Sequence, residues 1–362
     1  MHQYSDFSRD VQTDKPLPGS YEWWYFDAIS VDGYSLVVIF YDGNPFSRRY
    51  IQALQSTESG KSGLAADYPA VSISIYKGGK HIYYSFEEVN PSDAHFSPDK
   101  PEVRIAGNSL YGDREGNVLK YQLNLDQKLP NGDRLAGKLT FSSETDAGII
   151  LSGTDKEFSS KIKQETHEWN LVQPKAIVTG SMKISGYHEE QISFDGIGYH
   201  DHNLGREPMK DSFEEWYWGR YHFDQYTVAY YLMKEQGEWK KHAWIWSEAG
   251  KCLEISDIGL SNYGFNPFGL YTARVIQFTR GDLSFHLHQD RVVDSGPFYQ
   301  RFLGRAILKK GDHFEDADGI SEYIRPGRIY NRFFWPLVDM RIAYPNEVHW
   351  VQKSPMLYRW TW

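Results

Sequence analysis

Short runs of β-branched and aromatic residues, separated by Gly, Asp and Asn, recur along the whole of this chain. Turn residues at this spacing are typical of β-sandwiches and β-barrels. Long stretches with the 3.6-residue period of a helix are hard to find. The runs that we expect to form strands are residues 22–29, 34–41, 70–75, 81–86, 102–105, 109–111, 118–125, 135–141, 191–194, 217–223, 227–233, 242–246, 273–279, 283–289, 301–308, 322–324, 349–352 and 358–362. The sequence therefore predicts an all-β fold.

Composition narrows the class of ligand. Aromatic residues make up 16% of the chain, with 12 Trp and 26 Tyr. Aromatic side chains favour strands and line cavities that take flat or apolar ligands. The formal net charge is −9 and no basic block is present, which argues against nucleic acid as a partner. The single cysteine, Cys252, allows neither an intrachain disulfide nor a zinc site built from cysteines.

The start of the chain bears on localisation. The first residues, Met-His-Gln-Tyr-Ser-Asp, lack the basic stretch and apolar core of a signal peptide, although a chain trimmed of one would look the same. No apolar run approaches the roughly 18 residues that suggest a membrane-spanning helix. A lone cysteine fits a reducing compartment. We therefore expect a cytoplasmic protein.

An acid followed by an aromatic triplet occurs twice. Residues 22–27 read Glu-Trp-Trp-Tyr-Phe-Asp, and residues 215–220 read Glu-Trp-Tyr-Trp-Gly-Arg. Chance agreement between two short runs is one explanation, and internal duplication is the other. Duplication predicts two related β-domains, residues 1–205 and residues 206–362, with the joint in the polar loop at 205–213. Because no long linker is present, we expect the two domains to pack tightly.

The densest group of ionisable residues lies at 198–205, which reads Gly-Tyr-His-Asp-His-Asn-Leu-Gly. On a strand, side chains alternate between faces, so Tyr199, Asp201 and Asn203 would share one face and His200 would point to the other. A carboxyl group surrounded by aromatic walls is pushed toward its neutral form, as a general acid requires. The alternative is an ordinary Asp that caps a turn or pairs with an arginine. We treat Asp201 and Tyr199 as a candidate acid site.

Residues 167–169, His-Glu-Trp, form the second candidate. A strand would place His167 and Trp169 on one face, with Pro174 ending the segment or marking a sheet edge. A histidine could orient or reprotonate the acid, and an indole face could stabilise a cationic intermediate. The alternative is a structural histidine beside a core tryptophan.

Other kinds of site have less support. His167, His200 and His202 could supply three imidazoles to a metal ion, but no Glu stands at the helical spacing of a metalloprotease. The glycine-rich loops that hold nucleotide phosphates are missing from the sequence. So is a Gly-x-Ser-x-Gly nucleophile elbow, and Cys252 lacks a partner motif. We therefore expect no metal and no cofactor.

Taken in order, these motifs resemble the carotenoid 1,2-hydratase (hydroxyneurosporene synthase) and AttH-like family, with the lipocalin-like Diels–Alderases of fungal polyketide pathways as relatives. The resemblance rests on residues 22–28, 167–169, 198–205 and 216–220. It extends more thinly to the C-terminus. It implies two lipocalin-like, calycin-type β-barrel or sandwich domains packed together, with an apolar ligand cavity and no required cofactor.

The resemblance also implies roles for residues. Asp201 would protonate a terminal isoprenoid double bond, and Trp169 and Tyr199 would face the resulting tertiary cation. Water would be guided to that cation with the help of His167. The residues that we expect to contact the substrate are Trp23, Trp24, Tyr25, His200, Asn203, Trp216 and Trp218.

The chain departs from the hydratase pattern at two positions. Hydratases tend to carry Trp where this chain has His200, and Leu204 stands where a second aromatic residue is usual. The Tyr-His-Asp order is closer to the Diels–Alderase branch. We expect acid-initiated hydration or cyclisation of a hydrophobic polyene or isoprenoid. The alternatives are a Diels–Alder-type pericyclase and a non-catalytic lipid or pigment carrier. Such a substrate would arrive from lipid, which predicts peripheral membrane contact, although the sequence shows no amphipathic basic helix.

Overall fold

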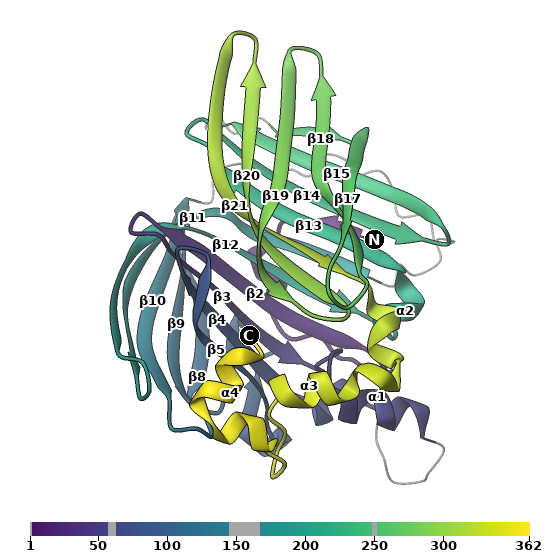
Figure 1. Cartoon of the computed structure of the whole chain (residues 1–362). Coiled ribbons are helices and arrows are strands. Elements are labelled where there is room, and N and C mark those ends of the chain that lie inside the picture. Colours follow the sequence, from purple (N-terminus) through teal and green to yellow (C-terminus); the bar gives the residue numbers. More distant parts are fainter. Residues whose placement is uncertain (1, 57–62, 145–166, 248–251) are drawn as a thin grey trace. The chain divides into compact units, whose positions relative to one another are not determined.

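The computed structural model of this chain consists mostly of antiparallel β-sheet (Figure 1). The residues that it describes are 2–56, 63–144, 167–247 and 252–362. Backbone contacts divide the chain into two compact units. The first contains the described residues up to 144, residues 167–209 and residues 332–362, and the second contains the described part of residues 210–331.

The first unit is built on a sheet whose strand order is β5-β4-β3-β2-β12-β11-β10-β9-β8-β7-β6, with β1 pairing in parallel to β11. Its described strands are β1 (His2–Tyr4), β2 (Tyr21–Ser30), β3 (Tyr34–Asp42), β4 (Ala70–Lys77), β5 (Lys80–Glu88), β6 (Ala94–Phe96), β7 (Glu102–Ile105), β8 (Asn108–Glu115), β9 (Val118–Lys128), β10 (Arg134–Glu144), β11 (His167–Ser185) and β12 (Glu190–Gly205). Phe26 on β2, Ile73 on β4 and Leu123 on β9 belong to one buried cluster, although their strands are far apart in the sheet. The sheet therefore curls around its apolar face.

The second unit repeats this plan with the strand order β16-β15-β14-β13-β21-β20-β19-β18-β17. Its described strands are β13 (Glu215–His222), β14 (Tyr226–Glu235), β15 (Glu238–Ser247), β16 (Cys252–Ile255), β17 (Ile258–Phe265), β18 (Tyr271–Arg280), β19 (Leu283–Ser295), β20 (Tyr299–Lys310) and β21 (His313–Ile324). Tyr230, Ile276 and Phe285 share one core across β14, β18 and β19. The predicted all-β, two-domain lipocalin-like fold is confirmed, since both sheets are curled half-barrels.

The described helices are short. They are η1 (Phe7–Arg9), α1 (Arg48–Gln55), η2 (Ala65–Asp67), η3 (Pro91–Asp93), α2 (Met209–Ser212), η4 (Pro326–Tyr330), η5 (Arg332–Phe334), α3 (Trp335–Arg341), η6 (Trp350–Lys353) and α4 (Pro355–Trp360). None of the helices in the described part of the chain is long and apolar enough to cross a bilayer.

The two aromatic runs occupy corresponding places in the two sheets. β2, which carries the first run, starts a meander through β3, β4 and β5, and its other edge pairs with β12, the last strand of its sheet. β13, which carries the second run, starts a meander through β14, β15 and β16 and pairs with β21, again the last strand. This shared topology is what an internal duplication would produce.

Three expectations differ from the structure. Residues 349–352 and 358–362 do not form strands, because the Ser354 hydroxyl caps α4 and Pro355 occupies the first helical turn. Pro174 does not end its strand, since the register of β11 against β12 shifts around it and the strand continues. Residues 332–362 pack with the first unit, whereas the predicted second domain included them.

Candidate active site

The candidate acid residues lie on β12, between β2 and β11. In that register Asp201 stands opposite Tyr25 on β2, and Asn203 stands opposite Trp169 on β11. Tyr199, Asp201 and Asn203 share one face of the sheet, as predicted from strand alternation, and their side chains bond to one another. Asp201 is only 3% exposed and Tyr199 is fully buried. Tyr199, Asp201 and Asn203 therefore form one polar cluster that is shielded from solvent.

Three side chains of this unit donate hydrogen bonds to Asp201. Tyr199 Oη–H and Trp169 Nε1–H each donate to Oδ2 at 2.7 Å, and Asn203 Nδ2–H donates to Oδ1 at 2.9 Å. The indole and amide nitrogens can only donate, whereas a tyrosine hydroxyl both donates and accepts. Tyr199 is therefore the member of this set that can accept a hydrogen bond from Asp201 when that carboxyl group is protonated.

His167 is joined to Asp201 through Asn203. Nε2 of His167 lies 3.2 Å from Oδ1 of Asn203, and Nδ1 lies 3.1 Å from the Tyr21 hydroxyl. Burial lowers the pKa of His167 to about 3, so its ring is neutral near pH 7 and carries one proton. Because Asn203 Oδ1 can only accept, that proton sits on Nε2, and Nδ1 accepts from Tyr21. His167 therefore orients the amide that holds the acid.

Aromatic side chains of β2 surround this cluster. Tyr21 stacks on Trp23 with ring centroids 5.2 Å apart, and Tyr25 meets Tyr199 edge-on at 6.2 Å. Gly205 stands opposite Tyr21, where a Cβ would overlap the tyrosine ring. The structure thus places Trp23 and Tyr25, two predicted binding residues, on the same face as the acid. Tyr21 was missed, although its spacing of two from Trp23 was a signal in the sequence.

Two other predicted binding residues, Trp24 and His200, lie on the opposite face of the sheet, in the core of the first unit. His200 stacks on Phe26 with ring centroids 3.8 Å apart, and Trp24 stacks on His202 at 4.4 Å. Both are buried. They do not share a face with Asp201, against the expectation, because neighbouring residues on a strand point to opposite sides.

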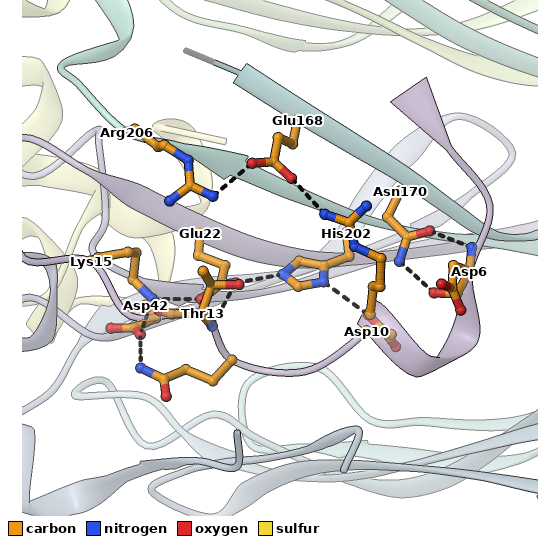
Figure 2. Close-up of polar contacts among 12 residues, drawn as sticks. Asp6, Asp10, Thr13, Lys15, Glu22, Asp42, Glu168, Asn170, His202 and Arg206 are labelled. Carbon is orange, nitrogen blue, oxygen red and sulfur yellow. Dashed lines mark hydrogen bonds and ion pairs between the residues drawn. The ribbon is translucent and has the colours of Figure 1, made fainter. Parts of the chain in front are cut away.

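The core face of β12 carries a buried ionic network (Figure 2). His202 lies between two carboxylates, with Nε2 3.0 Å from Glu22 Oε1 and Nδ1 3.2 Å from Asp10 Oδ1. Lys15 joins Glu22 to Asp42, with Nζ–O distances of 2.5 Å and 2.6 Å. All five side chains are almost completely buried. The N-terminal segment is therefore tied by charge to the back of the strand that carries Asp201.

Asp10 is the centre of this attachment. Its Oδ2 lies 3.0 Å from Nε2 of His200 and also accepts from the Tyr121 hydroxyl. Four residues earlier, Asp6 is held by Asn170 of β11, whose Oδ1 accepts from the Asp6 backbone N–H at 2.9 Å. Sequence analysis missed Asp10 because the N-terminal residues resemble an irregular lead-in. The signal was the pair of core-facing histidines, since buried polar groups need partners.

The charged groups of this network shift one another's pKa values. Burial alone would lower the pKa of His202, but the carboxylates of Asp10 and Glu22 raise it to about 9. Burial would raise the pKa of Asp10, yet His200 and His202 lower it to about 2. Against burial, His202 and Lys15 lower the pKa of Glu22 as well. Near pH 7 the network therefore contains the carboxylates of Asp10 and Glu22 beside the His202 imidazolium and the Lys15 ammonium, whereas burial raises the pKa of Asp42.

The structure does not bring together the three imidazoles of the alternative metal site. His167 bonds to Asn203 on the face of the acid, whereas His200 and His202 bond to Asp10 on the core face. Among the residues that the structure describes, no group of three or more His, Cys, Asp or Glu side chains is placed to hold a metal ion.

The remaining predicted binding residues, Trp216 and Trp218, lie on β13 in the second unit and are buried. Their contact with a substrate stays a prediction. β21 carries Glu322 opposite Trp218, in the place where β12 carries Asp201 opposite Tyr25. Glu322 accepts a hydrogen bond from Nε of Arg301 at 2.8 Å. The two sheets thus hold an acid at corresponding positions with different partners.

The chain is similar to known proteins in its sequence and in its fold. The chain is 27% identical over 333 residues to a hydroxyneurosporene dehydrogenase of Chlorobaculum tepidum, covering 87% of this chain and 85% of the relative. It is 25% identical over 350 residues to an acyclic carotenoid 1,2-hydratase of Thiocapsa roseopersicina, covering 94% and 76%. A Nitrosomonas europaea structure assigned to AttH superposes with a TM-score of 0.57 at 11% identity, covering 88% of this chain and 96% of that one, which shows the shared fold. The family Carotenoid hydratase CrtC matches residues 58–352, so this chain belongs to the CrtC carotenoid hydratase family.

Proposed function

We propose that this chain adds water to a terminal carbon–carbon double bond of an acyclic, carotenoid-like isoprenoid. The observation that carries the proposal is the setting of Asp201, a buried carboxyl group in contact with a tyrosine hydroxyl that can donate or accept a hydrogen bond. Membership of the CrtC carotenoid hydratase family supports the substrate class. The hydratase of Thiocapsa roseopersicina supports the reaction.

The reaction needs one proton and one water. In its protonated form Asp201 gives H⁺ to the terminal carbon, and the π electrons form the new C–H bond. A tertiary cation remains on the neighbouring carbon. Water attacks this cation, and the proton that it loses returns to Asp201. The alkene and water become a tertiary alcohol without an oxidant or a reductant.

Neighbouring side chains have separate roles in this scheme. Tyr199 and Trp169 are held next to the acid by the hydrogen bonds that they donate to it, and their ring faces would stabilise a cation that develops nearby. His167 fixes the amide of Asn203, which in turn fixes the carboxyl group. Holding a general acid in one orientation is what makes proton transfer efficient.

The test uses an acyclic carotenoid dispersed in detergent and water enriched in ¹⁸O. The expected product is heavier by one water, and its new oxygen comes from the solvent. Asp201→Asn, which keeps the size of the side chain, should lower the rate by about 10²- to 10⁴-fold. Glu190→Gln is the control, because it removes an acid from the far end of the same strand, where Glu190 pairs with the half-exposed Lys77, and we expect it to leave the rate unchanged.

Other outcomes would contradict hydration. A cyclase would give an isomer of unchanged mass, and a pericyclase would keep much of its rate in Asp201→Asn because restricted geometry supplies most of the acceleration. A carrier would release the bound ligand unchanged.

A further inference from the structure

Asp27, on β2, is a second buried carboxyl group on the face of the sheet that carries Asp201. Its neighbours in sequence, Phe26 and Ala28, belong to the core of the first unit. Because successive side chains of a strand point to opposite faces, Asp27 lies on the other side of the sheet, the side of Tyr25. Asp27 is 0% exposed, which is rare for an aspartate. The face of the candidate acid therefore holds a buried carboxyl group besides Asp201.

The pairing of β2 with β12 sets the distance between the two acids. Asp27 stands opposite Tyr199, and Asp201 stands opposite Tyr25, so the two acids are diagonal neighbours on adjacent strands. Residues in this relation are about 7–8 Å apart. Inverting glycosidases place an acid and a base about 6.5–9.5 Å apart, which leaves room between them for the attacking water. The positions of Asp27 and Asp201 fit the same arrangement of an acid and a base.

Hydration needs two proton transfers at two different atoms. Asp201 has to give its proton to one carbon of the double bond, whereas water has to approach the neighbouring carbon. Three donors also bond to the two oxygens of the Asp201 carboxyl group. A base acts on a water only within hydrogen-bond reach of it. A second carboxyl group on the same face, one strand away from Asp201, meets this need.

The side chains beside Asp27 are mostly apolar. On β3 the residue opposite Asp27 is Val37, which is buried, and on β12 it is Tyr199. An aliphatic group and an aromatic ring do not supply a base. At this end of the acid face, Asp27 is therefore the group that can take a proton from water.

We propose that Asp27 is the general base of the hydration and takes the proton of the attacking water. This role deepens the proposed function and rests on it. Asp201 gives H⁺ to the alkene, and the carboxylate of Asp27 accepts H⁺ from water as the new C–O bond forms, so the product is a neutral alcohol. After the alcohol leaves, water that enters the site carries the proton from Asp27 to Asp201. Both groups regain their starting forms, and the reaction consumes one alkene and one water.

The test separates protonation of carbon from capture by water. The parent, Asp27→Asn and Asp201→Asn chains are incubated in D₂O with an acyclic carotenoid dispersed in detergent, and mass spectrometry follows the alcohol and the recovered alkene. A cation that is not captured returns to alkene by losing H⁺ from the carbon that took D⁺, which keeps the deuterium. Asp27→Asn should hydrate about 10²- to 10⁴-fold more slowly, yet still put deuterium into the recovered alkene. Asp201→Asn should lose both reactions.

Two further variants support this comparison. Asp27→Asn keeps the size of the side chain, and its Tm shows whether the fold is intact. If it does not fold, Asp27→Ser removes the carboxyl group with a smaller side chain and takes its place in the assay. Glu190→Gln is the control, because it removes an acid of the same sheet that pairs with the half-exposed Lys77, and it should hydrate and exchange like the parent.

The ratio of deuterium exchange to hydration distinguishes the possible failures. A folded Asp27 variant that hydrates at the parent rate would overturn the role of Asp27 and leave that of Asp201 intact. Equal loss of hydration and exchange in this variant would also overturn it, because Asp27 would then act only by supporting the acid. A parent chain that neither hydrates nor exchanges would refute the proposed function, and the role of Asp27 with it.

Discussion

The two faces of β12 belong to the same strand, yet the pKa values of the buried histidines on these two sides of the sheet are shifted in opposite directions. On one face neutral groups, Tyr199, Trp169 and Asn203, bond to Asp201, and burial lowers the pKa of nearby His167 to about 3. On the other face carboxylates raise the pKa of His202 to about 9. Both faces are buried, so burial alone does not decide the charge of a group. The hydrogen-bond and ion-pair partners of each group decide its charge. They make one face of β12 suited to proton transfer and let the other face fix the N-terminal segment to the strand.

The largest difference between the two faces should be a difference in the free energy of unfolding when one acid on each face is replaced by its amide. Asp10→Asn leaves the buried His200 and His202 without their shared carboxylate. Breaking a buried ion pair costs about 3–5 kcal/mol, so we expect that loss in the free energy of unfolding. Asp201→Asn should cost about 1–3 kcal/mol, the price of leaving one buried donor unsatisfied. Urea unfolding of both variants measures this, and equal losses would contradict the division between the faces.

The second test uses alkaline pH. The folded-state pKa of His202 is raised from 6.5 to about 9, so its contribution to stability is complete below pH 6.5 and is lost as the pH rises through about 9. The free energy of unfolding should fall by at most about 1.4 kcal/mol per pH unit across this window. His202→Gln, which cannot become charged, should flatten that slope. A variant with the slope of the parent chain would show that another group causes it.

On the acid-site face the sign is reversed. The folded-state pKa of His167 is lowered from 6.5 to about 3, so the unfolded chain binds a proton first and stability falls as the pH drops from 6.5 toward 3. His167→Gln should remove this part of the acid sensitivity. The amide of Gln can still donate to Asn203, so most activity should remain. Thermal unfolding at several pH values, with the His202→Gln chain as reference, provides the measurement.

The smallest effect is expected at the far end of the same strand. Glu190 lies 2.7 Å from Lys77, whose side chain is half-exposed. Exposed ion pairs contribute about 0–1 kcal/mol, so Glu190→Gln should barely change the free energy of unfolding. Because it removes an acid from β12 without touching either polar cluster, it is the control for Asp10→Asn. A loss as large as that of Asp10→Asn would mean that any charge on this strand matters.

Much of the site could be predicted from strand alternation. Tyr199, Asp201 and Asn203 at spacings of two had to share a face once residues 190–205 formed a strand, and the aromatic run at 22–27 marked a strand as well. Strand alternation could not predict which residues of neighbouring strands stand opposite each other. That Trp169 stands beside Asn203 depends on the pairing of β11 with β12, which is fixed by contacts between distant parts of the chain.

The misses have physical causes. Asp10 and Lys15 lie in a segment without periodic apolar residues, and only the folded sheet brings them to His202 and Glu22. His200 was predicted to contact the substrate because of its place in the motif, although strand alternation already put it on the face opposite to Asp201. The C-terminal helices were mistaken for strands because their aromatic residues favour strands, although Ser354 and Pro355 marked a helix start.

The first unit is interrupted in the sequence, and this affects how the protein is made. Tyr358 completes the same core as Phe26, so a ribosome must finish all of the second unit before the first has its last core residue. Domains fold as units while they are synthesised, so the second unit can close while strands of the first still expose their apolar side. Nascent chains that stop short of residue 332 should therefore depend on chaperones far more than the released protein does.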